Sequence, residues 1–476
     1  MKKTICSLLI ILFLSLAVQQ LPSMATPGEV TLVVASPEWE PGKIIERLSQ
    51  KFTEYAQRVL GYPVKVVFDY SPWGTYYDRV ATVFAARSGE LDLVFADSQW
   101  LGEFAEGGHI LKLNDFIEAN PDLKYALFND TYDNIRIYHC TYPQGSDNYY
   151  GVPGTPDLTK LLIVRKDLLT HPEERAAFKA KYGYDLPQTY EDFLKLDWTQ
   201  LRDIAEFFTR KKGEKLAGKV LDHDFYGIAL VLARDYDYIS CYFLDVFWSW
   251  GNELWDPKTH ETLGYMNSEN AIDALKFFIS LVKYMPPGAP SFGYDEVITA
   301  YAEGRVAITA LWPSMQPAIY DPKTSLVWNV SMTVVMPGHL GKDGKWRRVI
   351  TLGGQPLVVS AYSSHKKEAL LYLKWFYTNK WFQEEFAREA GFTARKSIAE
   401  SEWFVKVKPW SRAFKDSMKY AKDFWNVPFY MELLEVQQIK WNEAVAGKIS
   451  PEEAMNYIAQ KQHEVVAKYG YLGSSS

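Results

Sequence analysis

Residues 64–117 read VKVVFDYSPWGTYYDRVATVFAARSGELDLVFADSQWLGEFAEGGHILKLNDFI, and this stretch decides the fold. Residues 64–68 are a β-branched run, residues 77–88 carry apolar side chains at helical spacing, and residues 91–96 form a second buried run. This order predicts a right-handed βαβ unit, in which ligands bind at the carboxyl ends of the strands. The loops at those two ends carry Trp73, Tyr76, Tyr77, Asp97, Ser98, Gln99 and Trp100. Flat aromatic faces beside hydrogen-bonding groups are typical of a carbohydrate site.

The stretch closely resembles bacterial extracellular solute-binding proteins of family 1, the sugar-type capture subunits of ABC importers. Shorter matches follow in the family's order: YGVP at 150–153, LPQTY at 186–190, WSWGNEL at 248–254, SFGYDE at 291–296, ALWPS at 310–314 and TARKS at 393–397. Each motif is weak alone, but together they cover nearly the whole chain. The resemblance implies an α/β, two-lobed periplasmic-binding-protein fold, with a mostly parallel sheet flanked by helices in each lobe.

Each lobe is expected to form from discontinuous segments. The turn-rich residues 142–153 indicate an interlobe crossing, and the resemblance implies a return to the first lobe near residue 356. We therefore assign residues 26–148 and 356–397 to the first lobe, and residues 149–355 and 398–476 to the second. Residues 169–224 are long and charged relative to the family pattern, which favours a solvated excursion without a ligand role.

The first 25 residues have the pattern of a cleaved secretory signal. Lys2 and Lys3 precede an apolar run at 8–18, and we expect cleavage after about Ala25. The run is too short for a membrane anchor, which needs about 20 apolar residues. Cys6 lies before the run, whereas a lipid-modified cysteine would follow it. These features predict a protein of the Gram-negative periplasm.

The composition is that of a globular protein with an unusual aromatic content. The chain has 476 residues, which favours two or three domains. Its formal net charge of −6 does not indicate the basic surface that binds nucleic acid. Aromatic residues make up 15%, with 16 Trp. Most are expected in the core, but tryptophans in predicted loops are better placed for function: Trp73, Trp100, Trp250 and Trp312.

Cys140 and Cys241 remain after processing. A disulfide is possible in an oxidising compartment, but the sequence separation gives no geometric support for one. Free cysteine is a common small core residue, so two buried thiols are expected.

No catalytic, cofactor or metal motif is convincing. Residues 213–219 match the spacing of a phosphate-binding loop, but Val220 replaces the Ser or Thr that would bind magnesium, and a helical rather than a strand pattern precedes it. The eight His are scattered singly, so neither a metal nor a cofactor is expected. A glycoside hydrolase would need two carboxylates about 5 to 10 Å apart, and candidates exist in Glu38, Glu40, Asp97 and Glu253. These carboxylates also suit the binding of sugar hydroxyls.

The candidate ligand residues combine aromatic faces with hydrogen-bonding groups. We predict the following set: Trp39, Trp73, Tyr76, Asp97, Gln99 and Trp100 from the first lobe; Asp157, Trp248, Trp250, Asn252, Trp312 and Ser314 from the second; Gly353, Gly354 and Gln355 at the return crossing; and Arg395 in the TARKS turn. Structural alternatives remain. Trp250 and Trp312 could cap a core, Asp97 could cap a helix, and Trp248 shares a helical apolar face at 242–251.

The predicted function is capture without catalysis. A carbohydrate, either a mono- or an oligosaccharide, would bind between the lobes, and hinge closure would follow because only the closed state offers both walls. The resemblance implies delivery to the membrane permease of an ABC importer by a monomer that binds no nucleic acid. Two alternatives stay open: transport of a polyol, glycosylated osmolyte or other small solute, and a secreted carbohydrate-active enzyme.

Overall fold

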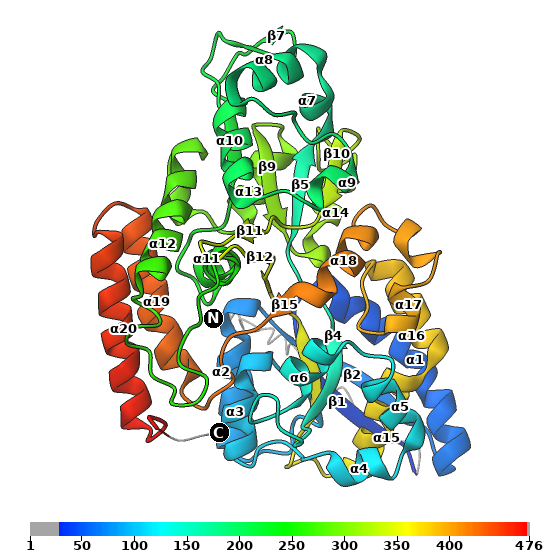
Figure 1. The fold of residues 1–476 in the computed structure, drawn as a ribbon. Helices are drawn as coiled ribbons and strands as arrows, with labels where there is room; N and C mark the ends of the chain where they lie inside the picture. Colours follow the sequence, from blue (N-terminus) through cyan, green and yellow to red (C-terminus); the bar gives the residue numbers. More distant parts are fainter. Residues whose placement is uncertain (1–27, 474–476) are drawn as a thin grey trace, which may run out of the picture.

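The computed structural model describes residues 28–473 and divides into two α/β lobes. In Figure 1 the first lobe lies below and the second above, with a group of long helices at the side. The predicted signal peptide and its cleavage point lie outside the described residues. Within the described range, the helices lack the combination of length and apolar composition needed to cross a membrane.

The first lobe contains a five-stranded sheet in the order β2-β1-β3-β14-β4. Its strands are β1 (Val30–Pro37), β2 (Val64–Ser71), β3 (Leu93–Phe95), β4 (Gly151–Thr155) and β14 (Gln355–Val359). β1 pairs in parallel with both β2 and β3, whereas β14 runs antiparallel to β3 and β4. The βαβ unit predicted from residues 64–96 is therefore present, with β1 inserted between its two strands.

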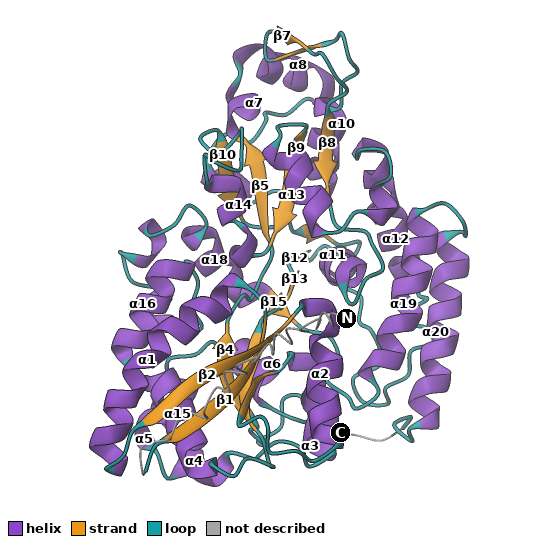
Figure 2. Cartoon of the chain, turned by 180° about the vertical axis from the view of Figure 1, so that it is seen from behind, coloured by secondary structure: helices purple, strands orange, loops and turns teal. Residues whose placement is uncertain are grey.

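Both faces of this sheet are covered by helices (Figure 2). Side chains alternate along β3: Leu93 and Phe95 enter the core under α1 and α15, while Val94 enters the core under α2. The helices of this lobe are α1 (Glu40–Leu60), α2 (Trp73–Ala85), α3 (Leu101–Glu106), α4 (Asn114–Glu118), α5 (Pro121–Phe128), α6 (Asp133–Cys140), α15 (Lys366–Thr378), α16 (Lys380–Ala390), α17 (Lys396–Ala399) and α18 (Ser411–Ser417).

Two of these helices begin earlier than the sequence pattern predicts. The amphipathic pattern of residues 44–60 predicts a helix from Ile44, but α1 starts at Glu40, because Pro41 occupies the first turn, where a missing N–H is tolerated. α2 was expected from Tyr77 but starts at Trp73. Trp73 therefore lies in the first turn of a helix rather than in a free loop.

The second lobe contains a four-stranded sheet in the order β10-β5-β9-β8. Its strands are β5 (Leu161–Arg165), β8 (Tyr226–Ala229), β9 (Val306–Leu311) and β10 (Ser331–Val334). Only β8 and β9 pair in parallel, whereas β5 is antiparallel to both of its neighbours. The two-lobed fold is as predicted, but both sheets are mixed, and the expectation of mostly parallel sheets is wrong in this detail. Neighbouring strands joined by long excursions can pair in parallel or antiparallel. The residue pattern of a strand does not show which of the two directions it takes.

Helices surround the second sheet and extend to one side. They are α7 (Lys166–Thr170), α8 (Pro172–Tyr182), α9 (Tyr190–Phe193), α10 (Trp198–Phe208), α11 (Tyr238–Ser249), α12 (Glu269–Leu281), α13 (Tyr294–Ala302), α14 (Pro317–Tyr320), α19 (Tyr430–Val445) and α20 (Pro451–Lys468). α19 and α20 pack beside α11 and α12 (Figure 1). The sequence pattern of residues 190–209 predicts a single helix, but Asp197 divides it into α9 and α10 by capping α10, accepting from the Thr199 N–H at 2.7 Å.

The charged excursion ends in a small hairpin rather than a phosphate loop. β6 (Lys215–Leu216) pairs with β7 (Lys219–Val220) inside the stretch that has phosphate-loop spacing. A second small hairpin joins β11 (His339–Leu340) to β12 (Trp346–Arg347). A phosphate loop must lead from a strand into a helix N-terminus, so the hairpin excludes that function for residues 213–219.

Three chain segments cross between the lobes and contact one another. β13 (Ile350–Thr351) pairs in parallel with β15 (Ala421–Lys422), and the Leu352 N–H donates to the Lys422 carbonyl at 2.8 Å. The segment before β5 joins them, because the Gly353 N–H donates to the Leu158 carbonyl at 3.0 Å. These three segments form the hinge region of the molecule.

Strand pairing and core packing shift two of the expected lobe limits. β4 pairs with β14 in the first sheet, so the crossing follows Thr155 instead of occupying residues 142–153. Phe404, Phe414 and Ala421 pack in the first-lobe core, so the chain re-enters the second lobe after β15 rather than at residue 398. The turn-rich composition of 142–153 reflects a surface connection before β4. The remaining limits stay predictions.

Cys140 and Cys241 are buried free thiols in different cores. We expect the processed protein to give no reaction with a thiol reagent when folded and two thiols per chain after denaturation, because burial excludes the reagent. A colorimetric thiol assay with and without guanidinium measures this. Reaction of fewer than two thiols in the denatured, unreduced protein would contradict the arrangement.

Candidate ligand-binding site

A cavity of about 290 Å³ opens between the lobes. It lies at the carboxyl ends of β1, β3 and β9, where ligands of α/β sheets collect. Its lining residues are Pro37, Glu38, Trp39, Trp73, Asp97, Gln99, Asp157, Asp237, Tyr238, Tyr294, Asp295, Trp312, Ser314, Met315, Leu352, Gly353, Gly354 and Gln355. Both lobes and the return crossing therefore contribute to one site.

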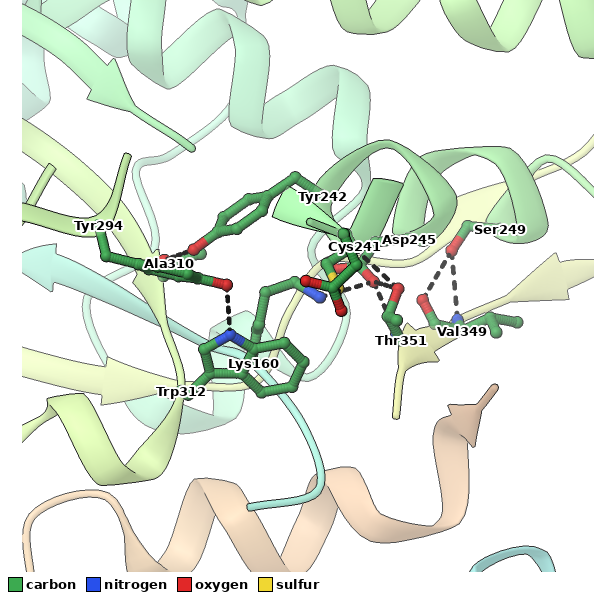
Figure 3. Close-up of polar contacts among 11 residues, drawn as sticks. Lys160, Cys241, Tyr242, Asp245, Ser249, Tyr294, Ala310, Trp312, Val349 and Thr351 are labelled. Atoms are coloured by element: carbon green, nitrogen blue, oxygen red, sulfur yellow. Dashed lines mark hydrogen bonds and ion pairs between the residues drawn. The ribbon is translucent and has the colours of Figure 1, made fainter. Parts of the chain in front are cut away.

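Tryptophans form the walls of the cavity on both sides. In the first lobe, the Trp39 and Trp73 ring centroids lie 6.2 Å apart, with their planes tilted by 33°. In the second lobe, the Trp312 Nε1–H donates to the Tyr294 hydroxyl at 2.7 Å, which fixes the indole against α13 (Figure 3). Aromatic faces held in this way cover the apolar face of a ligand at little further cost in side-chain entropy.

A buried ion pair supports the Trp312 wall from behind. Lys160 Nζ lies 4.6 Å from the Trp312 ring centroid and 3.3 Å from Asp245 Oδ1, and neither charged side chain is exposed (Figure 3). Asp245 also accepts from the Thr351 N–H at 2.7 Å and from its hydroxyl at 2.8 Å. The pair thus joins α11 to β13 of the hinge and to the site wall. Breaking such a pair would leave an uncompensated buried charge, at a cost of several kcal/mol (about 3–5).

Two glycines at the return crossing allow backbone to reach the site. A Cβ on Gly353 would lie 2.7 Å from Trp312 Cζ3 and 3.0 Å from the Asp157 carbonyl oxygen. Gly354 has φ of 87°, and a Cβ there would lie 2.4 Å from the Thr155 carbonyl oxygen. Only glycine combines this left-handed conformation with such a close approach.

Asp157 and Ser314 link the first crossing to the loop after β9. The Ser314 N–H donates to Asp157 Oδ1 at 3.1 Å, and the Ser314 hydroxyl donates to Oδ2. Burial raises the pKa of Asp157 to about 7, although both bonds from Ser314 oppose the shift. Asp157 therefore titrates near neutral pH inside the cavity.

A second polar cluster joins the lobes beside Trp73. The Tyr236 hydroxyl donates to Asp97 Oδ2 at 3.1 Å and accepts from Trp100 Nε1–H at 2.8 Å. Asp423 accepts from the Ser98 hydroxyl at 2.6 Å and from Gln99 Nε2–H at 2.6 Å. Tyr236 and Asp423 belong to segments of the second lobe and hinge, so these bonds hold the two sides of the cavity together.

Burial and like charges shift the acidic groups of this cluster. Burial, with the nearby carboxylates of Asp237 and Asp423, raises the pKa of Asp97 well above its usual range. Burial raises the pKa of Asp423 to about 7 and also raises the pKa of Asp237. These shifts arise because the charged forms lose hydration and repel one another.

The structure brings most of the predicted site residues together at the cavity. These are Trp39, Trp73, Asp97, Gln99, Asp157, Trp312, Ser314, Gly353, Gly354 and Gln355. All of them follow a strand end or lie at the return crossing, as the carboxyl-end rule requires.

Tyr76 and Trp100 lie behind the first-lobe wall instead of in the cavity lining. Tyr76 is 1% exposed and donates its hydroxyl to the Phe95 carbonyl at 2.8 Å, while Trp100 is 3% exposed. Tyr76 packs against Trp73 with ring centroids 6.3 Å apart. Both aromatic side chains position the lining residues rather than offering a face to a ligand.

Four second-lobe and TARKS candidates do not line the cavity. Trp248 faces the core, as its helical spacing suggested, and Trp250 stacks on His339 with ring centroids 3.6 Å apart. Asn252 is buried and bonds to the Phe247 carbonyl at 3.0 Å. Arg395 pairs with Asp130 in the first lobe. In this structure the four side chains pack in a core or pair with neighbouring residues instead of facing the cavity.

Several lining residues were not among the predicted ligand set. Tyr294 and Asp295 lie inside the SFGYDE motif, at the N-terminus of α13, so the signal was present in the sequence. Asp237 is the N-cap position of α11 and Tyr238 is its first residue, after the irregular residues 230–236 that follow β8. The carboxyl-end rule applied to β8 would have found them. The remaining lining residues lie next to predicted ones in the sequence: Pro37, Glu38, Met315 and Leu352.

The donor set does not suit a metal ion. Among residues 28–473, no group of three or more His, Cys, Asp or Glu side chains is arranged to hold one. The acidic residues of the cavity are instead distributed over both lobes.

The family and relatives of the chain agree with this architecture. Residues 43–381 match the model of the bacterial extracellular solute-binding protein family, and the chain belongs to this family. A Brucella abortus (strain 2308) protein, named only as a binding protein, is 20% identical over 461 residues, covering 96% of this chain and 98% of its own. The maltotriose-binding protein of Pyrococcus abyssi is 22% identical over 362 residues, covering 75% of this chain and 66% of its own.

Solved structures show the same fold. Maltose-bound MalE3 of T. maritima has a TM-score of 0.68 and 20% identity, covering 92% of this chain and 100% of its own. A solute-binding protein of Agrobacterium vitis with bound D-mannitol has a TM-score of 0.68 and 19% identity, covering 93% and 99%. The family consists of binding proteins, so this chain is a solute-binding protein and not an enzyme.

The close approach of Gly353 to Trp312 predicts a strong effect of a single methyl group. We expect Gly353→Ala to lower the free energy of unfolding by about 1–3 kcal/mol, because the added Cβ overpacks the indole and backbone. Gly74→Ala is the matched control, since a Cβ there meets nothing within 4 Å. Urea unfolding of the two variants measures the difference, and equal stability of both would contradict the packing.

The raised pKa of Asp157 predicts a pH-dependent effect of its replacement. An unfolded Asp titrates near 4, so between about pH 4 and 7 the folded protein holds a proton that the unfolded chain has lost, and this contribution to stability falls as pH rises. We compare the free energy of unfolding of Asp157→Asn with that of the original protein at the same pH. We expect this difference to change in favour of the variant by at least about 1 kcal/mol from pH 5 to pH 8.

Denaturation of the ligand-free proteins at both pH values measures this gain. Comparing the two proteins at the same pH cancels the titration of other groups. A constant difference between them would show that Asp157 titrates normally.

Proposed function

We propose that the protein is the periplasmic capture subunit of an ABC importer and binds a small carbohydrate or polyol between its lobes. One observation carries the proposal. Tryptophan faces from separate lobes, Trp39 and Trp73 on one side and Trp312 on the other, line a single cavity with hydrogen-bonding groups between them.

The chemistry of this lining matches a polyhydroxylated ligand. A pyranose or polyol presents C–H surfaces that aromatic rings cover, and hydroxyls that carboxylates and amides bind. Asp97, Gln99 and Gln355 supply oxygens and amide groups beside the rings. Such a site is selective without any covalent step.

The size of the cavity favours a small ligand. Its volume of about 290 Å³ is at the lower end of the range for ligand pockets, about 300–1,000 Å³. This supports a monosaccharide or a polyol over a long oligosaccharide. Structural neighbours have been solved with maltose, D-mannitol and α-D-tagatose, and others with the larger acarbose and cycloalternan. They support a hydroxylated ligand, whereas it is the cavity volume that favours a small one.

Closure of the hinge would couple binding to transport. The three paired crossings can bend while each lobe stays rigid, and a ligand that contacts both walls favours the closed state. The family is extracellular, and the N-terminal signal pattern supports export to the periplasm. The closed monomer would then deliver its ligand to the membrane permease.

A thermal-shift screen with D-glucose, maltose, D-mannitol, sorbitol and D-tagatose tests the proposal. A bound ligand at 100 times its dissociation constant stabilises the folded state by about 2.7 kcal/mol, so a clear rise in Tm is expected for at least one compound. Calorimetry should then show one site per chain and no product.

Tryptophan variants locate the site of that binding. We expect Trp73→Ala to weaken the affinity at least about tenfold, because the ring contributes stacking and buried apolar area. Trp381→Ala, which removes an exposed tryptophan of α16, should bind as the original protein does. Equal loss in both variants, or loss in neither, would contradict the proposed site.

A further inference from the structure

The cavity is lined by five carboxylates and by no cationic side chain of the described residues. The carboxylates belong to Glu38, Asp97, Asp157, Asp237 and Asp295, and they come from both lobes. From this lining we infer that the ligand carries a positive charge, as an amino sugar or another small hydroxylated amine does. The inference rests on the proposed function and specifies the chemical class that the site takes.

The inner carboxylates have only neutral hydrogen-bond donors. Asp97 accepts from the Tyr236 hydroxyl at 3.1 Å, and Asp237 Oδ2 accepts from the Cys241 thiol at 3.2 Å. The neighbouring Asp423 accepts from Ser98, Gln99 and the Phe424 N–H. Hydrogen bonds of this kind satisfy lone pairs, but they do not neutralise charge.

A buried cation behind the cavity wall is already paired with another carboxylate. Lys160 lies behind Trp312, with Nζ 3.3 Å from Asp245 Oδ1 and above the rings of Trp312 and Tyr242 (Figure 3). Lys422, next to Asp423 in the chain, pairs with Glu253 at 2.6 Å. Of the five carboxylates, Glu38 lies 3.9 Å from Lys43 Nζ. Within the described residues the other four, on Asp97, Asp157, Asp237 and Asp295, form no ion pair, although the charge of Lys160 acts on Asp237 from a longer distance.

A ligand ammonium group would match each feature of the lining. It supplies several N–H donors to Asp97 and Asp237, and its positive charge is attracted by carboxylates in a partly desolvated site. The faces of Trp39, Trp73 and Trp312 add cation–π attraction. A neutral sugar would gain the aromatic contacts and would hydrogen-bond to these carboxyl groups, whose raised pKa values favour the protonated form. It would not stabilise their ionised form as an ammonium group does.

Two polar atoms of cavity-lining residues have no hydrogen-bond partner within the described residues. Gln99 is 2% exposed, and its Oε1 accepts no hydrogen bond although its Nε2 donates to Asp423. The Trp39 Nε1–H is also without an acceptor. Both atoms are buried, so a ligand would reach them only after a small shift of the Gln99 and Trp39 side chains. An acceptor and a donor of this kind suit a ligand that has both N–H or O–H donors and hydroxyl oxygens. This supports a hydroxylated amine over a simple alkylammonium ion.

Matched pairs of compounds test the charge directly. Isothermal titration calorimetry at pH 7.5 compares D-glucosamine with D-glucose and N-methyl-D-glucamine with sorbitol. We expect the amine of at least one pair to bind at least about tenfold more tightly than its neutral partner. Preference for the neutral partner, or equal affinity, would overturn the inference while leaving the proposed function intact.

Absence of binding by both amines would also overturn the inference. The neutral panel of the thermal-shift screen is separate, so its success or failure decides the proposed function independently. Choline serves as an additional probe, because tighter binding of choline than of either hydroxylated amine would contradict the hydroxyl requirement.

Isosteric variants test which carboxylates act. We expect Asp97→Asn and Asp237→Asn each to reduce the affinity ratio between amine and neutral partner at least about fivefold. The matched control is Asp222→Asn, whose side chain is 91% exposed on the distant charged excursion. A ratio that stays constant in the cavity variants would overturn the inference.

Stability of the ligand-free variants separates a binding role from a structural one. Removal of a buried charge that repels its neighbours should leave Tm unchanged or raise it at pH 8, while the amine preference falls. A large drop in Tm for both Asp97→Asn and Asp237→Asn would assign these groups to folding and contradict their role in the ligand site.

Discussion

The packing of Trp312 against the backbone at Gly353 is the contact on which the binding site depends. The indole belongs to the second sheet, and the glycine belongs to the segment that returns to the first sheet. Behind them, the buried Lys160 and Asp245 pair joins the same crossing to α11. Because the wall and the hinge share these groups, a movement of the hinge necessarily moves one face of the cavity relative to the other.

This arrangement explains why the site is acidic as well as aromatic. Asp97, Asp157 and Asp423 hold positions that connect segments of different lobes, and each gains hydrogen bonds from the opposite side. Burial raises the pKa of all three carboxyl groups, well above the usual range for Asp97 and to about 7 for Asp157 and Asp423. Asp157 and Asp423 are therefore poised between protonated and ionised forms near neutral pH in the ligand-free site. A bound solute changes this balance, and the charge of the solute decides in which direction.

Much of the fold and part of the site could be predicted from the sequence, for a physical reason. Strand and helix periods are local, so the βαβ unit and the loops after its strands were recognised, together with Trp73, Asp97 and Gln99. Strand direction is not local, and neither mixed sheet was expected. Tryptophans of two similar-looking motifs also diverged: Trp312 of ALWPS reaches the cavity, whereas Trp250 of WSWGNEL stacks on His339, a partner about ninety positions later in the sequence. Pattern alone does not reveal such distant partners.

The most direct test of the account is hydrogen–deuterium exchange with and without the solute that gives the largest thermal shift. A ligand that contacts both lobes should protect the loops after β1, β3 and β9 and the return crossing 352–355 from exchange. Protection confined to one lobe, or centred on the separate hollow that Glu106, Trp255 and Trp425 line, would contradict it.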